Sequence, residues 1–322
     1  MGYSITGTVP AAGTVPSKTM YDLIIIGGGP AAVSAGIYAA RKKMKTLLIA
    51  KSWGGQAALA PLVENYAGVE PISGAKLVER MVGQLKKNEI EIKEGLGVKN
   101  VLLVDKGLTV EVETEDGSEQ GRALIVATGR TPKRLGLPNE EKFIGKGIVF
   151  CATCDAPMFK DKEVAVIGGG NSAANTALEA AVYASKVYLL ARSVLRADEV
   201  LQERLEKSDK IEIMTGATVQ EIKGDKFVSG LVYKKDASEE MKEMSVEGIF
   251  VAIGSIPNSS FIKNVVELNK WGEIKINSRN ATSRPNIFAA GDVSGVLYKQ
   301  MIIAAGEGAK AALSAYKYIS NK

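Results

Sequence analysis

Residues 23–40 read LIIIGGGPAAVSAGIYAA, an apolar run that enters a glycine turn and continues in a helical pattern. The turn carries GxGxxA from Gly27 to Ala32, the helix is predicted to reach about residue 44, and a second apolar strand follows at 46–49. In such a unit the early glycines permit a tight turn and the close approach of a pyrophosphate, which faces the helix N-terminus. The small third residue lets helix and strand pack. The stretch therefore predicts a dinucleotide-binding βαβ unit.

A second copy of this arrangement lies further along the chain. The strand 163–167 leads into GxGxxA from Gly168 to Ala173, followed by a helix to about residue 184 and a strand at 186–190. A single glycine pattern is weak evidence, because glycine-rich turns also serve plain packing. Two copies in the right order predict an α/β protein with two Rossmann-like nucleotide sites.

Cys151 and Cys154 are the only cysteines in the chain, and they stand together in CATCD at 151–155. A structural zinc site needs four nitrogen or sulfur ligands, and the chain has no histidine, so no metal site is predicted. A purely structural disulfide closing so short a loop would stabilise the fold little, because it removes little entropy from the unfolded chain. A redox-active dithiol is the favoured interpretation. With two nucleotide sites it predicts electron flow between a nicotinamide nucleotide and a disulfide, for which a flavin is the usual mediator.

Composition and charge exclude several other classes of function. With 322 residues, 46% hydrophobic and 24% charged, the chain is long enough for two domains with their own cores. Its net charge of +5 comes from scattered residues, with no basic track for nucleic acid. Glycine and proline break the uncharged stretch 23–40, which argues against a membrane span. The N-terminus lacks a secretory signal, which predicts a cytoplasmic protein, and residues 1–20 are predicted to form a tail.

The order of the motifs resembles that of the low-molecular-weight thioredoxin reductases, from residue 21 to the C-terminus. The motifs that carry the resemblance are GGGPAA (27–32), GGQ (54–56), VENYAG (63–68), ATG (127–129), CATCD (151–155), GGGNSA (168–173) and AAGDV (289–293). The C-terminal half, with ADEVLQERL at 197–205 and YKQMIIAAGEGAKAALSAY at 298–316, is also similar to the flavoprotein of the alkyl hydroperoxide reductase system. That flavoprotein carries an additional thioredoxin-like module, for which a tail of 20 residues is too short.

The resemblance implies an α/β protein with two three-layer ββα nucleotide-binding domains, the second inserted in the first. The FAD-binding domain would comprise 21–130 and 254–322, and the NAD(P)-binding domain with the CxxC motif would comprise 131–253. Two hinge strands are expected near Pro132 and Pro257. The resemblance also implies a homodimer.

The nucleotide contacts are likewise implied by the resemblance. For FAD they are Gly27, Gly29, Ala32, Gln56, Asn65, Gly129, Gly291, Asp292, Lys299, Gln300 and Met301. For the pyridine nucleotide they are Gly168, Gly170, Asn171, Ser172, Ala173, Arg192 and Arg196. Asp292 follows an apolar strand and can bind a ribityl hydroxyl, although it could instead cap a helix. Gln56 and Asn65 could be ordinary loop residues, and Ala50-Lys51 stands where an acidic ribose ligand is expected.

In the family that the chain resembles, the flavin passes two electrons to the disulfide. The resemblance assigns Cys154 as the flavin-side sulfur and Cys151 as the thiolate that attacks the disulfide of a thioredoxin or glutaredoxin-like partner. The leaving thiolate needs an acid, and in a chain without histidine the nearest candidate is Asp155. Burial near Phe150 and Met158 would raise its pKa. Alternatively, Asp155 caps the following turn.

The identity of the electron donor depends on the strand that ends in ARS at 191–193, with Arg196 a helical turn later. NAD-specific strands usually end in an acidic residue that holds the ribose 2′-hydroxyl, whereas Arg192 and Arg196 suit a 2′-phosphate. NADPH is therefore the predicted donor, although both arginines could be solvated surface charges. Where the family usually has a histidine and two arginines, this chain differs by substitution and is one residue shorter. Asn175-Thr176 replaces the family's usual glutamate pair. Some relatives with an eroded site take electrons from ferredoxin or deazaflavin.

The leading hypothesis is an FAD-containing, NADPH-dependent thioredoxin-disulfide reductase. The second is a reductase of the same fold that uses NADH, ferredoxin or reduced deazaflavin, or that serves a peroxiredoxin system. The third is a redox sensor without turnover, which the complete CATCD motif disfavours.

Overall fold

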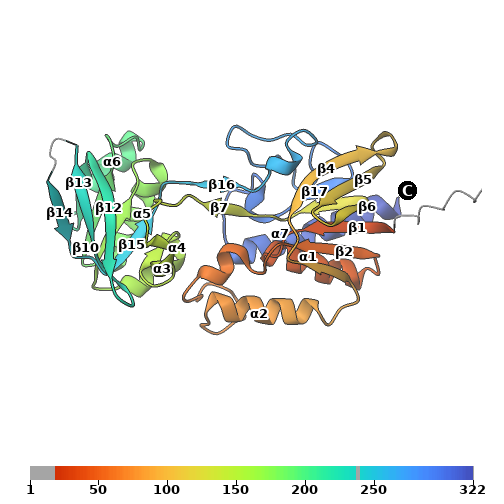
Figure 1. Cartoon of the computed structure of the whole chain (residues 1–322), viewed down its shortest axis with the longest axis horizontal. Coiled ribbons are helices and arrows are strands. Elements are labelled where there is room, and N and C mark those ends of the chain that lie inside the picture. The colour runs from red at the N-terminus through yellow and green to blue at the C-terminus, as the bar shows by residue number, and fades with distance from the viewer. Residues whose placement is uncertain (1–18, 237–239, 322) are drawn as a thin grey trace, which may run out of the picture.

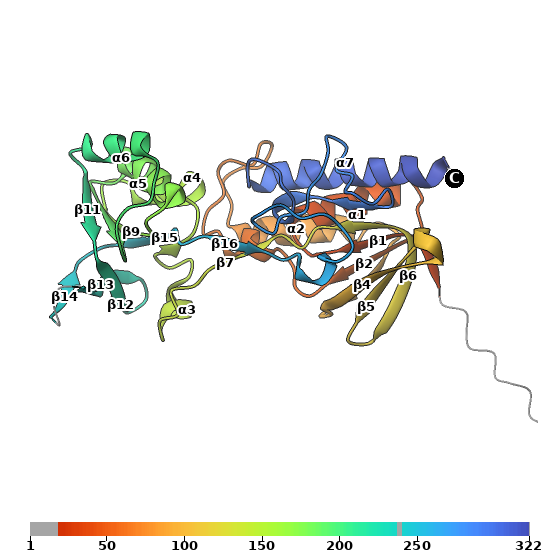
Figure 2. The ribbon, with the colours of Figure 1, turned by 90° about the horizontal axis from the view of Figure 1, so that it is seen from above.

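The computed structural model describes residues 19–236 and 240–321, which form two α/β units joined by a two-stranded link (Figure 1; Figure 2). The predicted tail at 1–20 lies outside the described residues except for Thr19 and Met20. Met20, predicted to lie in the tail, belongs to the first strand, where it lies opposite Gln120.

The first unit is built on a sheet of order β3-β2-β1-β6-β5-β4, with the short β17 also paired to β6. Its strands are β1 (Met20–Ile26), β2 (Thr46–Ala50), β3 (Glu91–Glu94), β4 (Val98–Val104), β5 (Thr109–Thr114), β6 (Gly117–Val126) and β17 (Ile287–Ala289). β1, β2, β3, β6 and β17 run parallel, whereas β4 and β5 fold back as an antiparallel meander. β2 is buried along its whole length, as expected for a parallel strand covered on both faces.

Helices cover one face of the parallel strands, and the β4–β5 meander folds over their other face, which gives three layers (Figure 2). The helices are α1 (Pro30–Arg41), α2 (Gly74–Leu85) and α7 (Met301–Ser320), and 3-10 turns lie at Gly55–Leu59, Asp105–Gly107, Ser260–Ile262 and Gly291–Val293. α1 and α7 pack closely, because a Cβ added at Gly308 would come 2.0 Å from the Ala31 carbonyl oxygen. No helix within 19–236 and 240–321 has both the length and the apolar character needed to cross a membrane.

The second unit has an all-parallel sheet of order β11-β10-β9-β15-β8. Its elements are β8 (Ile148–Val149), β9 (Glu163–Ile167), β10 (Lys186–Ala191), β11 (Ile211–Thr215), β15 (Gly248–Val251), α3 (Glu140–Phe143), α4 (Ala152–Asp155), α5 (Asn171–Tyr183), α6 (Glu199–Glu206) and a 3-10 turn at Ala156–Phe159. Its second sheet consists of β12 (Ala217–Gly224), β13 (Val228–Lys235) and β14 (Met241–Met244) and is antiparallel. This sheet packs on one face of the parallel sheet, and α5 packs on the other. The predicted fold class, two Rossmann-like units with the second inserted in the first, is confirmed.

Two short antiparallel strands, β7 (Arg130–Pro132) and β16 (Ser255–Pro257), join the units. The side chain of Asn258 fastens the base of this link, since it accepts a hydrogen bond from Thr131 Oγ1 (2.9 Å) and donates to the carbonyl of Thr128 (2.9 Å). Both strands lie where hinge strands were predicted. The predicted boundary between residues 130 and 131 falls inside β7.

Candidate functional site

A cavity of approximately 830 Å³ lies between the two units. Its walls come from the first glycine turn, β7 and the segment after β17 on one side, and from the disulfide segment of the second unit on the other. The predicted site residues that line it are Gly27, Gly29, Gln56, Gly129, Cys151, Cys154, Asp155, Gly291, Asp292, Lys299, Gln300 and Met301. The structure thus brings most of the predicted flavin contacts and both cysteines to one cavity, whose size is typical of a cofactor site.

The first glycine turn presents bare backbone to this cavity. Gly27 has a φ of 135°, and a Cβ there would lie 2.2 Å from the carbonyl oxygen of Ala127. Gly29 is the N-cap of α1, and no side chain of the described residues caps this helix. The first N–H groups of α1 are therefore available to an anion such as the pyrophosphate of FAD. Ala32 is buried in the core beneath the turn, where it packs and does not line the cavity.

Asp292 lies in the 3-10 turn directly after β17 and faces the same cavity. Burial raises the pKa of its carboxyl, while the nearby cations of Lys299 and Arg130 oppose the rise. Asp292 does not cap a helix, because the N-cap of its own turn is Ala290 and that of α7 is Gln300. The capping alternative is therefore wrong. A carboxylate in this position is suited to accept a hydrogen bond from a hydroxyl group.

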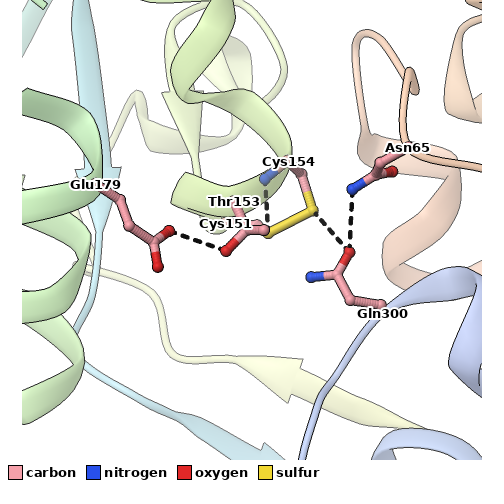
Figure 3. The surroundings of a disulfide bond; sticks show 6 residues. All are labelled: Asn65, Cys151, Thr153, Cys154, Glu179 and Gln300. Atoms are coloured by element: carbon pink, nitrogen blue, oxygen red, sulfur yellow. Dashed lines mark hydrogen bonds between the residues drawn. A yellow bond between two sulfur atoms is a disulfide. The ribbon is translucent and has the colours of Figure 1, made fainter. Parts of the chain in front are cut away.

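The side chains of Gln56 and Gln300 line the cavity, and that of Asn65 contacts Gln300. Gln56 donates from Nε2 to the backbone carbonyl of Arg130 in β7 (3.0 Å). Asn65 donates from Nδ2 to Oε1 of Gln300 (3.2 Å), and this oxygen lies 3.7 Å from Sγ of Cys154 (Figure 3). Asn65 does not itself line the cavity, so it reaches the site through Gln300. Direct contacts of Gln56 and Asn65 with FAD stay predictions.

Cys151 and Cys154 form a disulfide, with their Cα atoms 5.4 Å apart. Cys151 is the N-cap of α4, and its Sγ accepts a hydrogen bond from the backbone N–H of Cys154 (3.2 Å). Thr153 donates from Oγ1 to Oε2 of Glu179 in α5 (2.9 Å), on the side opposite Gln300 (Figure 3). The second unit therefore holds the short helix from one side, and the disulfide faces the first unit on the other.

Asp155 closes α4 and is buried, with 5% of its surface exposed. Burial raises the pKa of its carboxyl from 3.8 to about 7, although a backbone hydrogen bond with Cys151 acts in the opposite direction. Its Oδ1 has no hydrogen-bond partner among the residues that the structure describes. Asp155 occupies the N-cap position of the 3-10 turn that follows, but its side chain makes no capping hydrogen bond there, so capping by this carboxyl is not observed.

The second glycine turn lies away from the cavity, in the second unit. Gly168 has a φ of 150°, and a Cβ there would come 2.5 Å from the Ala252 carbonyl oxygen. Gly170 is the uncapped N-cap of α5 and has no described atom within 4 Å of an ideal Cβ. Ser172 is exposed, whereas Ala173 is fully buried under the turn. The turn is thus built like the first one and is suited to a second pyrophosphate.

The loop that carries the two predicted arginines is fastened to this turn. Asp198 donates from its backbone N–H to Oδ1 of Asn171 (2.8 Å), and Asn171 donates from Nδ2 back to Oδ2 of Asp198 (2.8 Å). The backbone N–H of Arg196 donates to the carbonyl of Gly169 (2.6 Å). Asn171 was predicted to contact the nucleotide, but its amide is engaged by Asp198. The exposed side chains of Arg192 and Arg196 make no ion pair or hydrogen bond within 19–236 and 240–321.

Several residues that shape the site were missed by the sequence patterns. Arg130 and Glu273 form an ion pair beside the cavity (2.7 Å), and Asn258 and Asp198 fasten backbone segments. Arg130 directly follows the ATG motif, which was a usable signal. Glu273 belongs to no motif, and its sequence neighbourhood carries no signal for its role.

Comparisons with known proteins agree with this geometry. The sequence pattern of the family described as pyridine nucleotide-disulphide oxidoreductase matches residues 21–308. The chain is 44% identical over 307 residues to the F component of the alkyl hydroperoxide reductase of Pseudomonas aeruginosa, covering 94% of this chain and 59% of that protein. It is 40% identical over 314 residues to the corresponding component from Staphylococcus epidermidis, covering 97% and 62%. The chain thus spans about three fifths of the length of these relatives.

Solved structures give a second set of similar proteins. The thioredoxin reductase from Streptococcus pyogenes is 34% identical with a TM-score of 0.90, over 95% of this chain and 100% of that one. The thioredoxin reductase of Lactococcus lactis, in its FR conformation, is 36% identical with a TM-score of 0.64, over 94% and 100%. Of these two, the slightly more identical sequence superposes less well over the whole chain.

Proposed function

Since the chain belongs to the pyridine nucleotide-disulphide oxidoreductase family, we propose that it is an NADPH-dependent reductase that acts through FAD and the Cys151–Cys154 disulfide on a thioredoxin-like protein. It is an oxidoreductase, and the family and structural neighbours imply FAD and a pyridine nucleotide. The identity of the donor and that of the partner are the parts proposed here.

The observation that supports this function best is that the disulfide and the first glycine turn share one cavity. The N-terminus of α1 would hold the pyrophosphate of FAD, Asp292 a ribityl hydroxyl, and the start of α7 with Lys299 the ring system. When bound, FAD supplies the transfer of an electron pair between nicotinamide and disulfide. The bare backbone at Gly27 and the uncapped helix fit such a group.

The chain's own groups account for the thiol steps. Two electrons break the S–S bond, and Cys154, which lies against Gln300, is the sulfur on the side of the first unit. The thiolate of Cys151 then attacks the partner's disulfide and releases one partner thiolate, and Cys154 resolves the mixed disulfide to release the second. Asp155, whose pKa burial raises to about 7, is partly protonated at neutral pH and can give its proton to a departing thiolate.

NADPH is proposed as donor because β10 ends at Ala191 with no acidic residue for a ribose 2′-hydroxyl. Arg192 and Arg196 are exposed on a loop whose backbone is fixed to the glycine turn, and their side chains make no ion pair or hydrogen bond with the described residues, so both are available to a 2′-phosphate. NADH, ferredoxin and reduced deazaflavin are the competing donors.

Anaerobic titration of the purified protein tests flavin, disulfide and donor together. We expect a yellow protein that takes up about four electrons per chain, two for the flavin and two for the disulfide, from NADPH and less readily from NADH. A colourless protein that cannot be reconstituted with FAD would contradict the function. Reduction by deazaflavin alone would retain the function and change the donor.

The proposed partner is a thioredoxin or glutaredoxin-like protein, which the structural neighbours favour. A peroxiredoxin system is the second candidate, because the curated relatives are components of alkyl hydroperoxide reductases. NADPH oxidation should be measured with thioredoxin, with a glutaredoxin-like protein and with a peroxiredoxin plus peroxide. Turnover with the peroxiredoxin that needs no added thioredoxin would favour the second candidate.

Cys151 and Cys154 line the cavity, and we propose that the second unit rotates about β7 and β16 to present the disulfide to a partner. The moving body would be 131–253 and the fixed one 21–130 with 254–322. Support comes from the two thioredoxin reductases with similar identity but TM-scores of 0.90 and 0.64, as different unit orientations would produce. A cytoplasmic location and a homodimer complete the proposal, and the homodimer rests on the resemblance alone.

A further inference from the structure

Charged side chains from distant parts of the sequence meet beside the cavity. Glu273 accepts a hydrogen bond from Nη1 of Arg130 in β7 (2.7 Å) and forms an ion pair with Nζ of Lys299 (3.2 Å), both through Oε1. Its other oxygen, Oε2, accepts from Nδ2 of Asn269 (2.8 Å). The side chains of Arg130, Glu273 and Lys299 are 16%, 13% and 24% exposed. Charges this well buried are screened little by solvent and act strongly on neighbouring groups.

The two cations face the cavity, whereas Glu273 lies behind them. Arg130 and Lys299 line the cavity wall, and Glu273 does not. Burial is the main cause of the raised pKa of Asp292, and the two cations and Glu273 act on it with opposite signs. Although burial opposes ionisation of Glu273, the Asn269 hydrogen bond and the two cations together keep its pKa below the ordinary value. Glu273 is therefore an ionised counter-charge within electrostatic reach of groups in the cavity.

We propose that Glu273 is a positioning residue that holds Arg130 and Lys299 in the cavity wall and sets the charge balance felt by the bound flavin. The inference deepens the proposed function and rests on FAD binding in this cavity. Reduced flavin carries more negative charge than oxidised flavin, so uncompensated cations nearby favour the reduced form. With Glu273 in place, the wall is closer to neutral, and the electron pair passes more readily to the Cys151–Cys154 disulfide.

The test compares two variants that each remove one negative charge from the same part of the chain. Glu273→Gln removes the buried carboxylate, and Glu267→Gln removes an exposed one that pairs with Lys275 (3.2 Å). The readout is the ratio of reduced to oxidised flavin in the holoenzyme at anaerobic equilibrium with a reference dye. We expect Glu273→Gln to shift this ratio at least about tenfold toward reduced flavin, since at a dielectric constant of about 20 a unit charge has that effect even from about 12 Å away. Glu267→Gln should change it less than about twofold.

A double variant tests the inference even if the single variant Glu273→Gln loses its flavin. In Glu273→Gln/Arg130→Met one freed cation is also removed, so the ratio should return most of the way to that of the natural protein. If Glu273→Gln loses its flavin, restored flavin content in the double variant supports the inference, and failure to restore it contradicts the inference. An unchanged ratio in a flavin-replete Glu273→Gln, or a double variant shifted as far as the single one, overturns it. Absence of flavin from the natural protein would overturn the proposed function instead.

Discussion

The stability of Asp155→Asn relative to that of the natural protein should increase as the pH rises. A carboxyl whose pKa is 3.8 when unfolded and about 7 when folded keeps its proton longer in the folded state. Between these two pH values the folded state of the natural protein binds more protons than the unfolded state. Its free energy of unfolding therefore falls by about 1.4 kcal/mol for each unit by which the pH rises. The loss begins near the unfolded pKa and is complete above the folded pKa, at about 4 kcal/mol in all. Asparagine has nearly the same shape and no charge to bury, so the variant escapes this loss.

The measurement is urea unfolding of the oxidised protein, followed by far-ultraviolet circular dichroism at intervals from pH 5 to pH 8.5. Relative to the natural protein, Asp155→Asn should gain about 3 kcal/mol between pH 5 and pH 8 and then level off. Asp225→Asn removes an exposed carboxylate from the same unit and should give a difference that is independent of pH within about 0.5 kcal/mol. A constant offset between Asp155→Asn and the natural protein at every pH would refute the raised pKa and, with it, the role of Asp155 as an acid.

Three further outcomes are expected. Gly27→Ala would bring a Cβ within 2.2 Å of a backbone carbonyl and should abolish the visible absorbance of bound flavin; Gly83→Ala, in open space on α2, should keep it and gain about 0.5 to 1 kcal/mol of stability. Arg192→Ala should raise the KM for NADPH at least about tenfold at low salt and leave that for NADH nearly unchanged; equal losses would show that Arg192 does not contact the 2′-phosphate. Cys154→Ser should lower the reductive titration from about four electrons per chain to about two, and an unchanged end point would place the second electron pair elsewhere.

The parts of the fold that sequence predicted well are those governed by short-range patterns. The strand predicted at 163–167 coincides with β9, because a short apolar run between a charged segment and a glycine turn leaves little choice of boundary. The helix predicted to reach about residue 44 ends at Arg41, since the backbone turns at Lys43 with a φ of 57°. No composition rule anticipates a left-handed lysine. Helix ends are decided by such local turns.

In the site, too, short motifs were predictable and contacts between distant residues were not. Motif order placed Cys154 and Gln300 among the predicted site residues, because each lies in a recognisable segment, and the structure brings both to one cavity. The engagement of Asn171 by Asp198 and the ion pair of Arg130 with Glu273 could not be predicted, since they join residues far apart in sequence. Such pairs depend on how loops pack after the fold has formed, and neither periodicity nor spacing records that.

The position of β17 also determines the order in which the chain can be assembled. β17 pairs with residues 124–126 of β6, although the whole second unit lies between them in sequence. During synthesis this edge of β6 stays open while residues 127–286 emerge, long enough for the second unit to fold first. Its folding sets β7 beside β16 and so removes about 1.5 kcal/mol of the entropic cost of bringing β17 back to β6. Folding of the second unit therefore assists completion of the first. Variants that slow its folding should leave the edge of β6 exposed in nascent chains and promote aggregation.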